Sequence, residues 1–529
     1  MDITPDSVLT TDPLQALPVS TTKKRVAIVG AGISGLAHAD VLTRCGFECV
    51  LFERAPKLGG VWAHTYPGVT LQNNAAGYHL SSFPWPFPPD LHPTGTQILR
   101  YLDALVAARG FDVRLQHEVV SAREREGGWD VALRITRPEG EEERTERFDH
   151  LLVSIGQYTE GKHRLNLPGE EEFPGRVITE RELHDLALFD GARVAVVGFG
   201  KSALDMATFA APRAKAVHHV FRTPRWTIPR TVFGVHFSKL LFNRFSSIMM
   251  PSWAHPSALE RLLHRKKWVV RGFWTNLQNL FAFLARRQAR GHGEAGEARL
   301  AEVLPDHGLV TDLRSAAALV PDNYYELIGR GTIQPHRGKT ARLSAEGLHL
   351  ANGQVIAADV VVLSVGSKSP SFPFLAPELR ALLEGEPDGV QLYRHVVHPR
   401  IPSLAFAGYN HGFLHIPAAE VGALWLAALW QGKLELPPVE EMESAVEHVR
   451  TWKRQNITFE PSRSCAVSTR FQQYLDIMLA DLGVSPYRKL PNPLAEIFAP
   501  YEARDYAGVV DEFLAHSPER RYRPSKLRT

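Results

Sequence analysis

The stretch Arg25–Gly35, which reads Arg-Val-Ala-Ile-Val-Gly-Ala-Gly-Ile-Ser-Gly, decides the fold. An apolar run of buried-strand type leads directly into three glycines spaced G-x-G-x-x-G, and a helical pattern follows. Gly30 permits the tight turn, Gly32 lets a pyrophosphate approach the backbone, and Gly35 lets the helix pack on the strand. Free amides and the dipole of that helix favour an anion at its N-terminus. The stretch therefore predicts a dinucleotide site on a parallel α/β sheet.

An acidic residue at the end of the next strand strengthens this interpretation. Glu53 follows the apolar run 50–52, at about the spacing expected of a carboxylate that accepts both ribose hydroxyls. A second glycine pair comes soon after, in the stretch 58–62, which reads Leu-Gly-Gly-Val-Trp. We expect both features to lie beside the same cofactor.

The same order of strand, glycines and helix returns later in the chain. The apolar run 194–197 leads into Gly198–Ala203, a G-x-G-x-S-A variant in which Ala203 takes the third glycine position. The dinucleotide fingerprint tolerates this substitution. Arg222 stands at the end of the following strand, 217–221, where an NAD site more often carries an acid. Because an arginine can fork onto a 2'-phosphate, a second dinucleotide is predicted, NADPH in preference to NADH.

The bulk composition limits the kind of protein. A chain of 529 residues suggests two or three packed units rather than one core. The 60 Lys and Arg residues exceed the 57 Asp and Glu residues by only three, so no strong field predicts binding to nucleic acid or to an anionic membrane. Three cysteines and a start without signal-peptide features favour a reducing, cytoplasmic location. The longest apolar stretch, 421–430, is far shorter than the roughly 18 residues of a spanning helix.

Two similar strand patterns indicate how the units are connected. The run 359–365 ends in Gly366 and resembles the run 149–155, which ends in Gly156, as though the chain leaves one sheet and then re-enters it. We therefore expect doubly wound parallel sheets, with one unit inserted into the other. The segment 235–300 carries apolar residues at helical spacing and several basic residues. A helix that covers a substrate channel is favoured over one that lies on a membrane surface.

Together these motifs resemble the flavin-containing monooxygenases, the class that also includes the Baeyer-Villiger enzymes. The resemblance covers roughly residues 24–435. It rests on the blocks Glu53–Trp62, Val197–Asp205, Arg222–Arg230 and Leu392–Val396, and on Gly408, Pro417, Glu420 and Trp425. It implies FAD in the first cradle and NADPH in the second. The expected fold class is α/β with two Rossmann-like dinucleotide-binding domains, the NADPH domain being inserted into the FAD domain, and with a helical insertion.

Domain limits follow from this resemblance. They are a polar N-terminal tail at 1–22, the first part of the FAD-binding domain at 23–165, the NADPH-binding domain at 166–355 with the helical insertion 235–300, the second part of the FAD-binding domain at 356–450 and a C-terminal extension at 451–529.

The resemblance also places the site residues. In such enzymes an asparagine stands beside the flavin after the glycine-tryptophan block, so Asn73 is the first choice for a catalytic residue and Asn74 the second. A neutral amide can donate to the terminal oxygen of a flavin hydroperoxide without exchanging a proton with it. The expected cofactor-binding residues are Gly30, Gly32, Ser34, Gly35, Glu53, Arg54, Gly60, Val61, Trp62, Val119, Gly198, Gly200, Lys201, Ser202, Arg222, Gly366 and Gly408.

Two departures from the family pattern bear on the subclass. The fingerprint F-x-G-x-x-x-H-x-x-x-Y, with W in the Baeyer-Villiger branch, aligns on Phe173–Gly175, but its histidine falls on Thr179 and its aromatic residue on Leu183. Ser364–Ser367 stands where Ala-Thr-Gly-Tyr is usual. Both segments lie where the two domains are expected to communicate, so the subclass stays open at this point.

The implied reaction inserts one atom of O2 into a small organic substrate through a flavin C4a-hydroperoxide, after NADPH has reduced the flavin. Oxygenation at nitrogen or sulfur is favoured, because the second cradle ends in Ser202 and Ala203 and because Leu183 is not Trp. Baeyer-Villiger oxidation of a ketone or aldehyde is the alternative. An NADPH oxidase or reductase and a non-catalytic nucleotide-binding scaffold are further alternatives.

Residue spacing also bears on other kinds of site. A disulfide reductase needs a C-x-x-C pair beside its flavin, whereas Cys45 and Cys49 are spaced C-x-x-x-C. No metal site is predicted, because His218 and His219 point to opposite faces of one strand. The expected partners are a small-molecule substrate and O2. Nucleic acid and a transmembrane segment are not expected, peripheral membrane contact is disfavoured, and a homodimer is compatible with the sequence.

Overall fold

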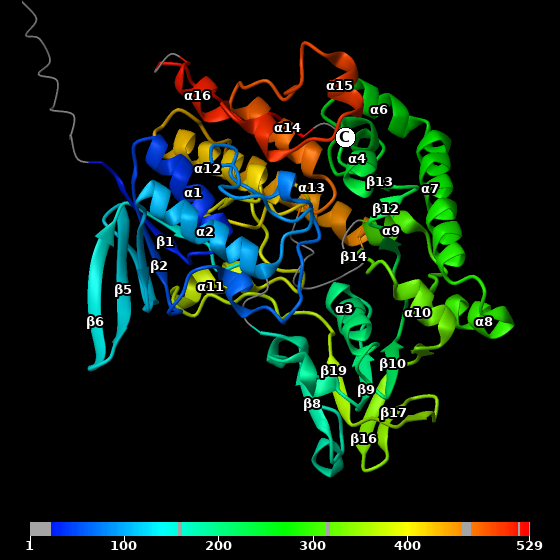
Figure 1. Ribbon diagram of the computed structural model, residues 1–529. Coiled ribbons are helices and arrows are strands. Elements are labelled where there is room, and N and C mark those ends of the chain that lie inside the picture. Colours follow the sequence, from blue (N-terminus) through cyan, green and yellow to red (C-terminus); the bar gives the residue numbers. More distant parts are fainter. Residues whose placement is uncertain (1–22, 157–160, 314–317, 458–466, 517–518, 528–529) are drawn as a thin grey trace, which may run out of the picture.

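The computed structural model describes residues 23–156, 161–313, 318–457, 467–516 and 519–527. The predicted polar tail, 1–22, lies outside this part of the chain. The described residues form two main sheets with helices packed against them, and a helical layer lies beside both (Figure 1). The expected α/β class with two dinucleotide-type sheets is confirmed.

The first unit is built around the first glycine loop. In chain order it contains β1 (Arg25–Val29), α1 (Ile33–Arg44), β2 (Glu48–Glu53), α2 (Gly95–Arg109), β3 (Asp112–Leu115), β4 (His117–Arg125), β5 (Gly128–Arg137), β6 (Gly140–Phe148), β7 (His150–Val153), α11 (Pro377–Glu384), β20 (Val397–His398), β21 (Ile401–Phe406) and α12 (His415–Trp430). The sheet order is β20-β21-β7-β1-β2-β3, and only the pairing of β20 with β21 is antiparallel. A separate antiparallel sheet, β4-β5-β6, stands at the side of this unit (Figure 1).

The second unit is built around the second glycine loop. It contains β8 (Arg176–Thr179), β9 (Arg193–Val197), α3 (Lys201–Ala210), β10 (Ala216–Phe221), α10 (Tyr324–Arg330), β15 (Ile333–Arg337), β16 (Thr340–Ser344), β17 (Gly347–Leu350), β18 (Val355–Ile356) and β19 (Val360–Leu363). Its main sheet has the order β15-β10-β9-β19-β8 and is parallel throughout. The glycine loop follows β9, near the middle of the sheet, so its amides face the carboxyl edge of the strands.

The prediction that the run 359–365 re-enters the first sheet is wrong. Its strand, β19, pairs with β9 and β8 in the second sheet, with Val360 opposite Val194. The chain returns to the first sheet only at β21, where Leu404 lies opposite Leu151 of β7. An apolar run that ends in glycine suits either sheet, and only tertiary packing selects its neighbours. One unit is still inserted into the other. The chain returns to the first sheet later than residue 356, where the second part of the FAD-binding domain was expected to start.

The segment predicted to form a helical insertion is helical. It contains β13 (Val235–His236), α4 (Phe237–Leu241), α5 (Arg244–Ile248), α6 (Ala258–Arg265), α7 (Lys267–Gln288) and α8 (Gly293–Val303), followed by α9 (Leu309–Leu313). The short strands β11 (Thr227–Ile228), β12 (Thr231–Val232) and β14 (Ala318–Leu319) flank it. On α7 the residues Val270, Trp274, Phe281 and Ala285 are buried, so the apolar face of this helix is turned into the protein. No helix in the described part of the chain is long and apolar enough to cross a membrane.

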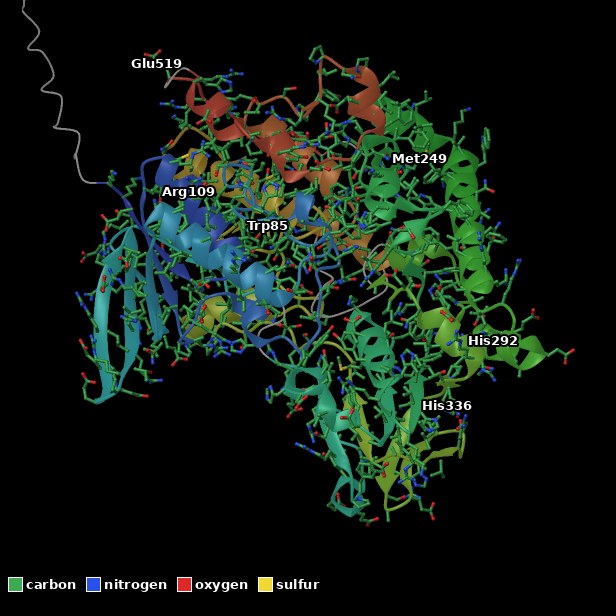
Figure 2. The ribbon with its side chains drawn as sticks, in the orientation of Figure 1. Trp85, Arg109, Met249, His292, His336 and Glu519 are labelled. Carbon is green, nitrogen blue, oxygen red and sulfur yellow. The ribbon has the colours of Figure 1, made fainter. Side chains whose placement is uncertain are left out.

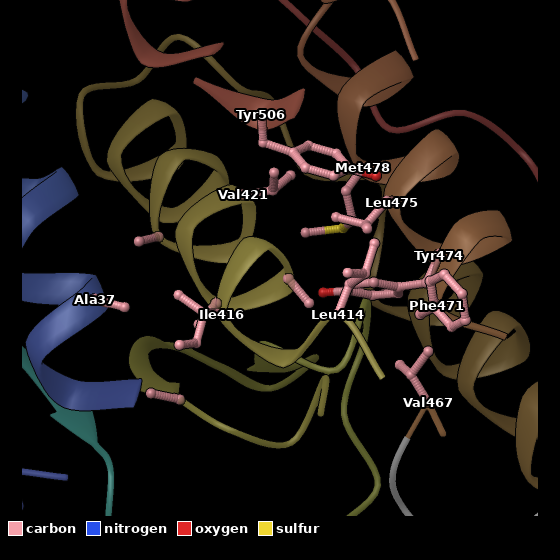
Figure 3. Packing of buried hydrophobic residues seen from close by; sticks show 14 of the residues in the cluster. Ala37, Leu414, Ile416, Val421, Val467, Phe471, Tyr474, Leu475, Met478 and Tyr506 are labelled. Carbon is pink, nitrogen blue, oxygen red and sulfur yellow. The ribbon is translucent and has the colours of Figure 1, made fainter. Parts of the chain in front are cut away.

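The C-terminal extension packs on both the first unit and the helical insertion. It contains α13 (Val439–Asn456), α14 (Phe471–Asp481), α15 (Pro493–Phe498) and α16 (Val509–Leu514). Figure 3 shows Leu475 and Met478 of α14 beside Val421 of α12. In Figure 2, Met249, which follows α5, lies close to the C-terminal helices.

A buried ion cluster joins the insertion to the extension. The Arg244 guanidinium on α5 donates to Asp476 and to Glu496, at 2.6 Å in each case. All three side chains are buried or nearly so. The extension, to which the sequence assigned no role, therefore forms part of the structural core.

Candidate functional site

A single cavity of about 1870 Å³ joins the carboxyl edges of the two parallel sheets. It is larger than the roughly 300–1000 Å³ of an ordinary small-ligand pocket. Both glycine loops line it, together with nearly all the residues predicted to bind cofactors and with Asn73. Two of the predicted site residues, Gly35 and Asn74, do not line the cavity.

The first glycine loop has no room for side chains at two of its three glycines. Gly30 has φ +106°, and a Cβ atom there would lie 2.4 Å from the carbonyl oxygen of Ser154. A Cβ atom at Gly35 would lie 2.4 Å from the carbonyl oxygen of Gly30. Gly35 thus acts where helix and strand meet rather than at the cavity. The backbone between β1 and α1 is left bare toward the cavity, as a pyrophosphate requires.

The Glu53 carboxylate is held at the cavity wall by two backbone amides. It accepts hydrogen bonds from the Ala31 amide at 3.1 Å and from the Ala55 amide at 2.9 Å. The bond to Ala31 ties the end of β2 to the glycine loop. A carboxylate has about four lone-pair sites, so capacity remains for ribose hydroxyls.

The second glycine loop is packed more tightly still. Gly198 has φ +128°, and a Cβ atom there would lie 2.1 Å from the carbonyl oxygen of Ser364 on the neighbouring crossing. Ala203, which replaces the third glycine, is fully buried and is accommodated on α3. A Cβ atom at Gly200 would meet no protein atom within 4 Å. The space in front of Gly200 is therefore open toward the cavity.

Two cations flank the end of β10 at the cavity. Arg222 is exposed and lines the cavity, and its side chain has no partner among the described residues. Lys339 also lines the cavity, after the strand β15 that pairs with β10. Lys339 could not be identified from the sequence, because only the three-dimensional pairing of β10 and β15 brings it near Arg222. These two side chains give this end of the cavity a positive charge.

Lys201 has a different environment from the one that the motif suggests. Lys201 lines the cavity, but its ammonium group is bonded to the Asp205 carboxylate one turn along α3. Asp205 also accepts a hydrogen bond from the Tyr66 hydroxyl at 2.8 Å. Burial lowers the pKa of Lys201, and the Asp205 charge opposes this shift.

The two candidate asparagines have separate roles. Asn73 is 6% exposed and lines the cavity. Its amide nitrogen donates to the Phe413 carbonyl oxygen at 2.5 Å, and its amide oxygen accepts from the backbone of Asn74 at 2.8 Å. The Asn74 side chain instead accepts from the Gly77 amide and donates to the Ser238 hydroxyl. Asn73 is the asparagine that reaches the cavity, whereas Asn74 holds the turn.

Comparison with known proteins shows which proteins this chain resembles. The model of the FMO-like family, flavin-binding monooxygenase-like, matches residues 23–271. A probable flavin-containing monooxygenase 1 of Arabidopsis thaliana is 29% identical, over 92% of this chain and 96% of its own length. Dimethylaniline monooxygenase [N-oxide-forming] 2 of Rattus norvegicus is 27% identical, over 88% of this chain and 83% of its own. The chain is therefore similar to flavin-containing monooxygenases over most of its length.

Solved structures share the fold of this chain at lower identity. An open crystal structure of cyclohexanone monooxygenase is 18% identical, covers 88% of this chain and 98% of its own, and has a TM-score of 0.62. The S-allyl-L-cysteine S-oxygenase from Allium sativum is 20% identical, covers 94% of this chain and 100% of its own, and has a TM-score of 0.59.

The segments that depart from the family pattern lie at the junction of the two units. Thr179 ends β8 and is buried, and its hydroxyl donates to the Glu182 carboxylate at 2.9 Å. Leu183 is buried in the second unit. Ser364–Ser367 lines the cavity, and the buried Ser364 hydroxyl has no partner among the described atoms. Thr179 and Leu183 thus serve local packing, and the hydroxyl of Ser364 is buried in the wall of the cavity.

A third loop that lines the cavity was missed in the sequence. The loop between β21 and α12, with the first residue of α12, contributes three side chains to the cavity wall: His411, Phe413 and His415. His415 Nε2 lies 3.0 Å from the Ser34 hydroxyl, and burial lowers the pKa of His415 to about 4, so its ring is neutral. A signal was present, because β21 is followed by Gly408 and then by an apolar helix, the same order as in the two cradles.

The two cysteines in the described part of the chain do not support a disulfide reductase. Neither Cys45 nor Cys49 is among the residues that line the cavity. Burial raises the pKa of Cys45 to about 11 and that of Cys49 to about 12. Both are therefore protonated thiols away from the site.

Proposed function

We propose that this protein is an FAD- and NADPH-dependent monooxygenase that transfers one oxygen atom of O2 to nitrogen or sulfur of a small organic substrate. The observation that carries the proposal is the single cavity lined by both glycine loops and by Asn73. Two nucleotide cofactors that must exchange electrons need such a shared space.

The first cradle suits FAD. The bare backbone at Gly30 and Gly32 receives the pyrophosphate, Glu53 binds the ribose of the adenosine half, and α1 directs its N-terminus at the phosphates. Gly408 carries no side chain where a Cβ atom would approach the Ser34 hydroxyl to 3.1 Å. This keeps the path along the first sheet free for an extended cofactor.

The second cradle suits NADPH. Gly198 and Gly200 present bare backbone, and Ser202 lies at the first turn of α3. Arg222 and Lys339 supply the positive charge that a 2'-phosphate requires. Lys201, bonded to Asp205, positions the first turn of α3 rather than the 2'-phosphate.

Reduced FAD, when bound, supplies the reaction with O2, and the chain supplies orientation and shelter from water. The Asn73 amide is fixed by its bonds to Phe413 and Asn74. It presents a neutral hydrogen-bonding group that neither takes up nor releases a proton near neutral pH. His415 is likewise neutral, so the first unit places no titrating imidazolium beside Ser34.

Oxygenation of nitrogen or sulfur is supported by the names of the sequence relatives, which include N-oxide-forming enzymes. The experiment is product analysis under 18O2 with NADPH and three substrates, a tertiary aromatic amine, an alkyl thioether and a cyclic ketone. We expect one labelled oxygen atom in an N-oxide or a sulfoxide. Labelled lactone as the sole product would instead establish Baeyer-Villiger oxidation.

A further inference from the structure

The helical insertion reaches the site through a second layer of side chains. None of the described residues in 235–300 is among those lining the cavity, so this segment does not cover it as expected. Instead, Ser238 of α4 bonds to Asn74, the Ser238 hydroxyl bonds to His236, and His236 bonds to His92.

These hydrogen bonds form a closed circuit, because His92 also contacts the turn that carries the candidate asparagines, Asn73 and Asn74. His92 Nδ1 lies 3.0 Å from the carbonyl oxygen of Asn73 and 3.1 Å from that of Leu71. His92 and His236 meet through their Nε2 atoms at 3.0 Å. The turn is therefore held from both sides, by His92 along its backbone and by Ser238 at the Asn74 side chain.

The donors and acceptors in this circuit have one consistent arrangement. His92 Nδ1 faces two carbonyl oxygens and must carry a proton, so in the neutral ring Nε2 is the acceptor. His236 Nε2 must then donate to it, and His236 Nδ1 accepts from the Ser238 hydroxyl at 2.7 Å. The Ser238 oxygen in turn accepts from the Asn74 amide at 3.0 Å. This arrangement, in which each ring nitrogen is either a donor or an acceptor, holds for two neutral imidazoles.

The surroundings keep both rings neutral. Burial is the largest cause of the lowered pKa of His92, and the Arg230 charge adds to it, while Asp322 opposes it. Burial also lowers the pKa of His236 to about 4, with His92, Lys239 and Arg230 acting in the same direction. A second proton on His92 would set N–H against N–H across the 3.0 Å contact, and a second proton on His236 would place an N–H opposite the Ser238 hydroxyl that donates to Nδ1.

We propose that His92, His236 and Ser238 are positioning residues that lock the Asn73–Asn74 turn to the helical insertion and so fix the Asn73 amide at the cavity. The functional part of this inference rests on the role of Asn73 in the proposed function. The structural part stands on the hydrogen bonds alone, and the two can be tested separately.

The variants divide the circuit into its parts. His92→Asn keeps a donor near the position of Nδ1 for the two carbonyl oxygens but removes the acceptor for His236. His92→Ala removes the bonds to the two carbonyl oxygens and the bond to His236, and Ser238→Ala removes the link to Asn74. His292→Asn, at the residue that precedes α8 and is labelled far from these elements in Figure 2, is the matched control.

The first readout is hydrogen exchange in peptides that cover residues 71–80, measured by mass spectrometry with and without FAD. The amides of Asn74 and Gly77 are bonded to the side chains of Asn73 and Asn74. We expect severalfold faster exchange in His92→Ala and Ser238→Ala, a smaller change in His92→Asn and none in His292→Asn. Wild-type exchange in variants that keep the wild-type melting temperature would overturn the proposal.

The second readout is the share of NADPH oxidation that yields oxygenated product rather than hydrogen peroxide. We expect this share to fall severalfold in His92→Ala and Ser238→Ala, as in Asn73→Ala, with the KM for NADPH unchanged and with partial recovery in His92→Asn. If Asn73→Ala lowers the share but the circuit variants leave it unchanged, positioning is refuted. If Asn73→Ala itself leaves the share unchanged while exchange accelerates as expected, the role of Asn73 in the proposed function is refuted instead.

Discussion

Gly198 approaches the carbonyl oxygen of Ser364 so closely that a Cβ atom at this position would lie 2.1 Å from it. The backbone at Gly198 also has φ +128°, a conformation that favours glycine. We therefore expect Gly198→Ala to force the second cradle apart from the crossing at Ser364. The variant should have a lowered melting temperature and should lose measurable NADPH binding, while the first cradle retains FAD.

Gly200, in the same motif, provides the control. A Cβ atom there would meet no protein atom, so Gly200→Ala should keep the wild-type melting temperature. The variant should still bind NADPH more weakly, because its methyl group occupies the space in front of the loop. Thermal denaturation together with NADPH titration separates the two cases, and an equal loss of stability in both variants would contradict this assignment.

Arg222→Gln should weaken the preference for NADPH over NADH. A charge-assisted hydrogen bond is worth about 1.5–3 kcal/mol, so the KM for NADPH should rise roughly 10- to 150-fold. The KM for NADH should stay unchanged, because NADH lacks the 2'-phosphate. Steady-state kinetics with both coenzymes check this, and an equal rise for both would assign Arg222 to general stability. Lys339→Ala should show the same selectivity with a smaller effect, since a lysine does not fork onto a phosphate.

The parts of the site that could be predicted from the sequence are those whose chemistry is local. The glycine loop at Gly30, Glu53 and Arg222 each follow a strand within a few residues, so strand pattern and spacing were sufficient to place them at one cavity. Their roles toward cofactors stay predictions.

Features that depend on pairing between distant segments could not be predicted. The run containing Val360 has the same pattern as a strand of the first sheet, and only its packing beside β9 assigns it to the second. His92 and His236 are 144 residues apart, and Lys339 reaches the cavity only because β15 pairs with β10. Neither imidazole carries any local motif that would mark it.

Arg244→Leu should destabilise the protein strongly. It would leave the buried carboxylates of Asp476 and Glu496 without their shared cation, and breaking a buried ion pair from one side costs about 3–5 kcal/mol. Arg330→Ala on α10 is the matched control, because its pair with Glu326 is largely exposed and such pairs contribute at most about 1 kcal/mol. Urea unfolding of both variants tests this. Similar losses would mean that the extension does not depend on the cluster.

Glu420 on α12 should make the stability of the protein fall as pH rises. Its carboxyl group is buried, accepts hydrogen bonds from the backbone and the hydroxyl of Ser81, and has a pKa raised from 4.5 to about 8, chiefly by burial. Between these two values the unfolded chain releases the proton while the folded protein keeps it. The folded state therefore binds more protons, and the free energy of unfolding falls with rising pH by up to about 1.4 kcal/mol per pH unit from this group. Below pH 4.5 both states are protonated and the effect vanishes.

Glu420→Gln keeps the size and an acceptor oxygen of the side chain but does not titrate. Relative to the wild type, its free energy of unfolding should decline less between pH 5.5 and pH 7.5, by about 2–3 kcal/mol at full effect. Urea unfolding of both proteins at the two pH values gives this difference directly. Parallel curves would mean that Glu420 is already ionised in the folded protein, with the Ser81 bonds stabilising its charge against burial.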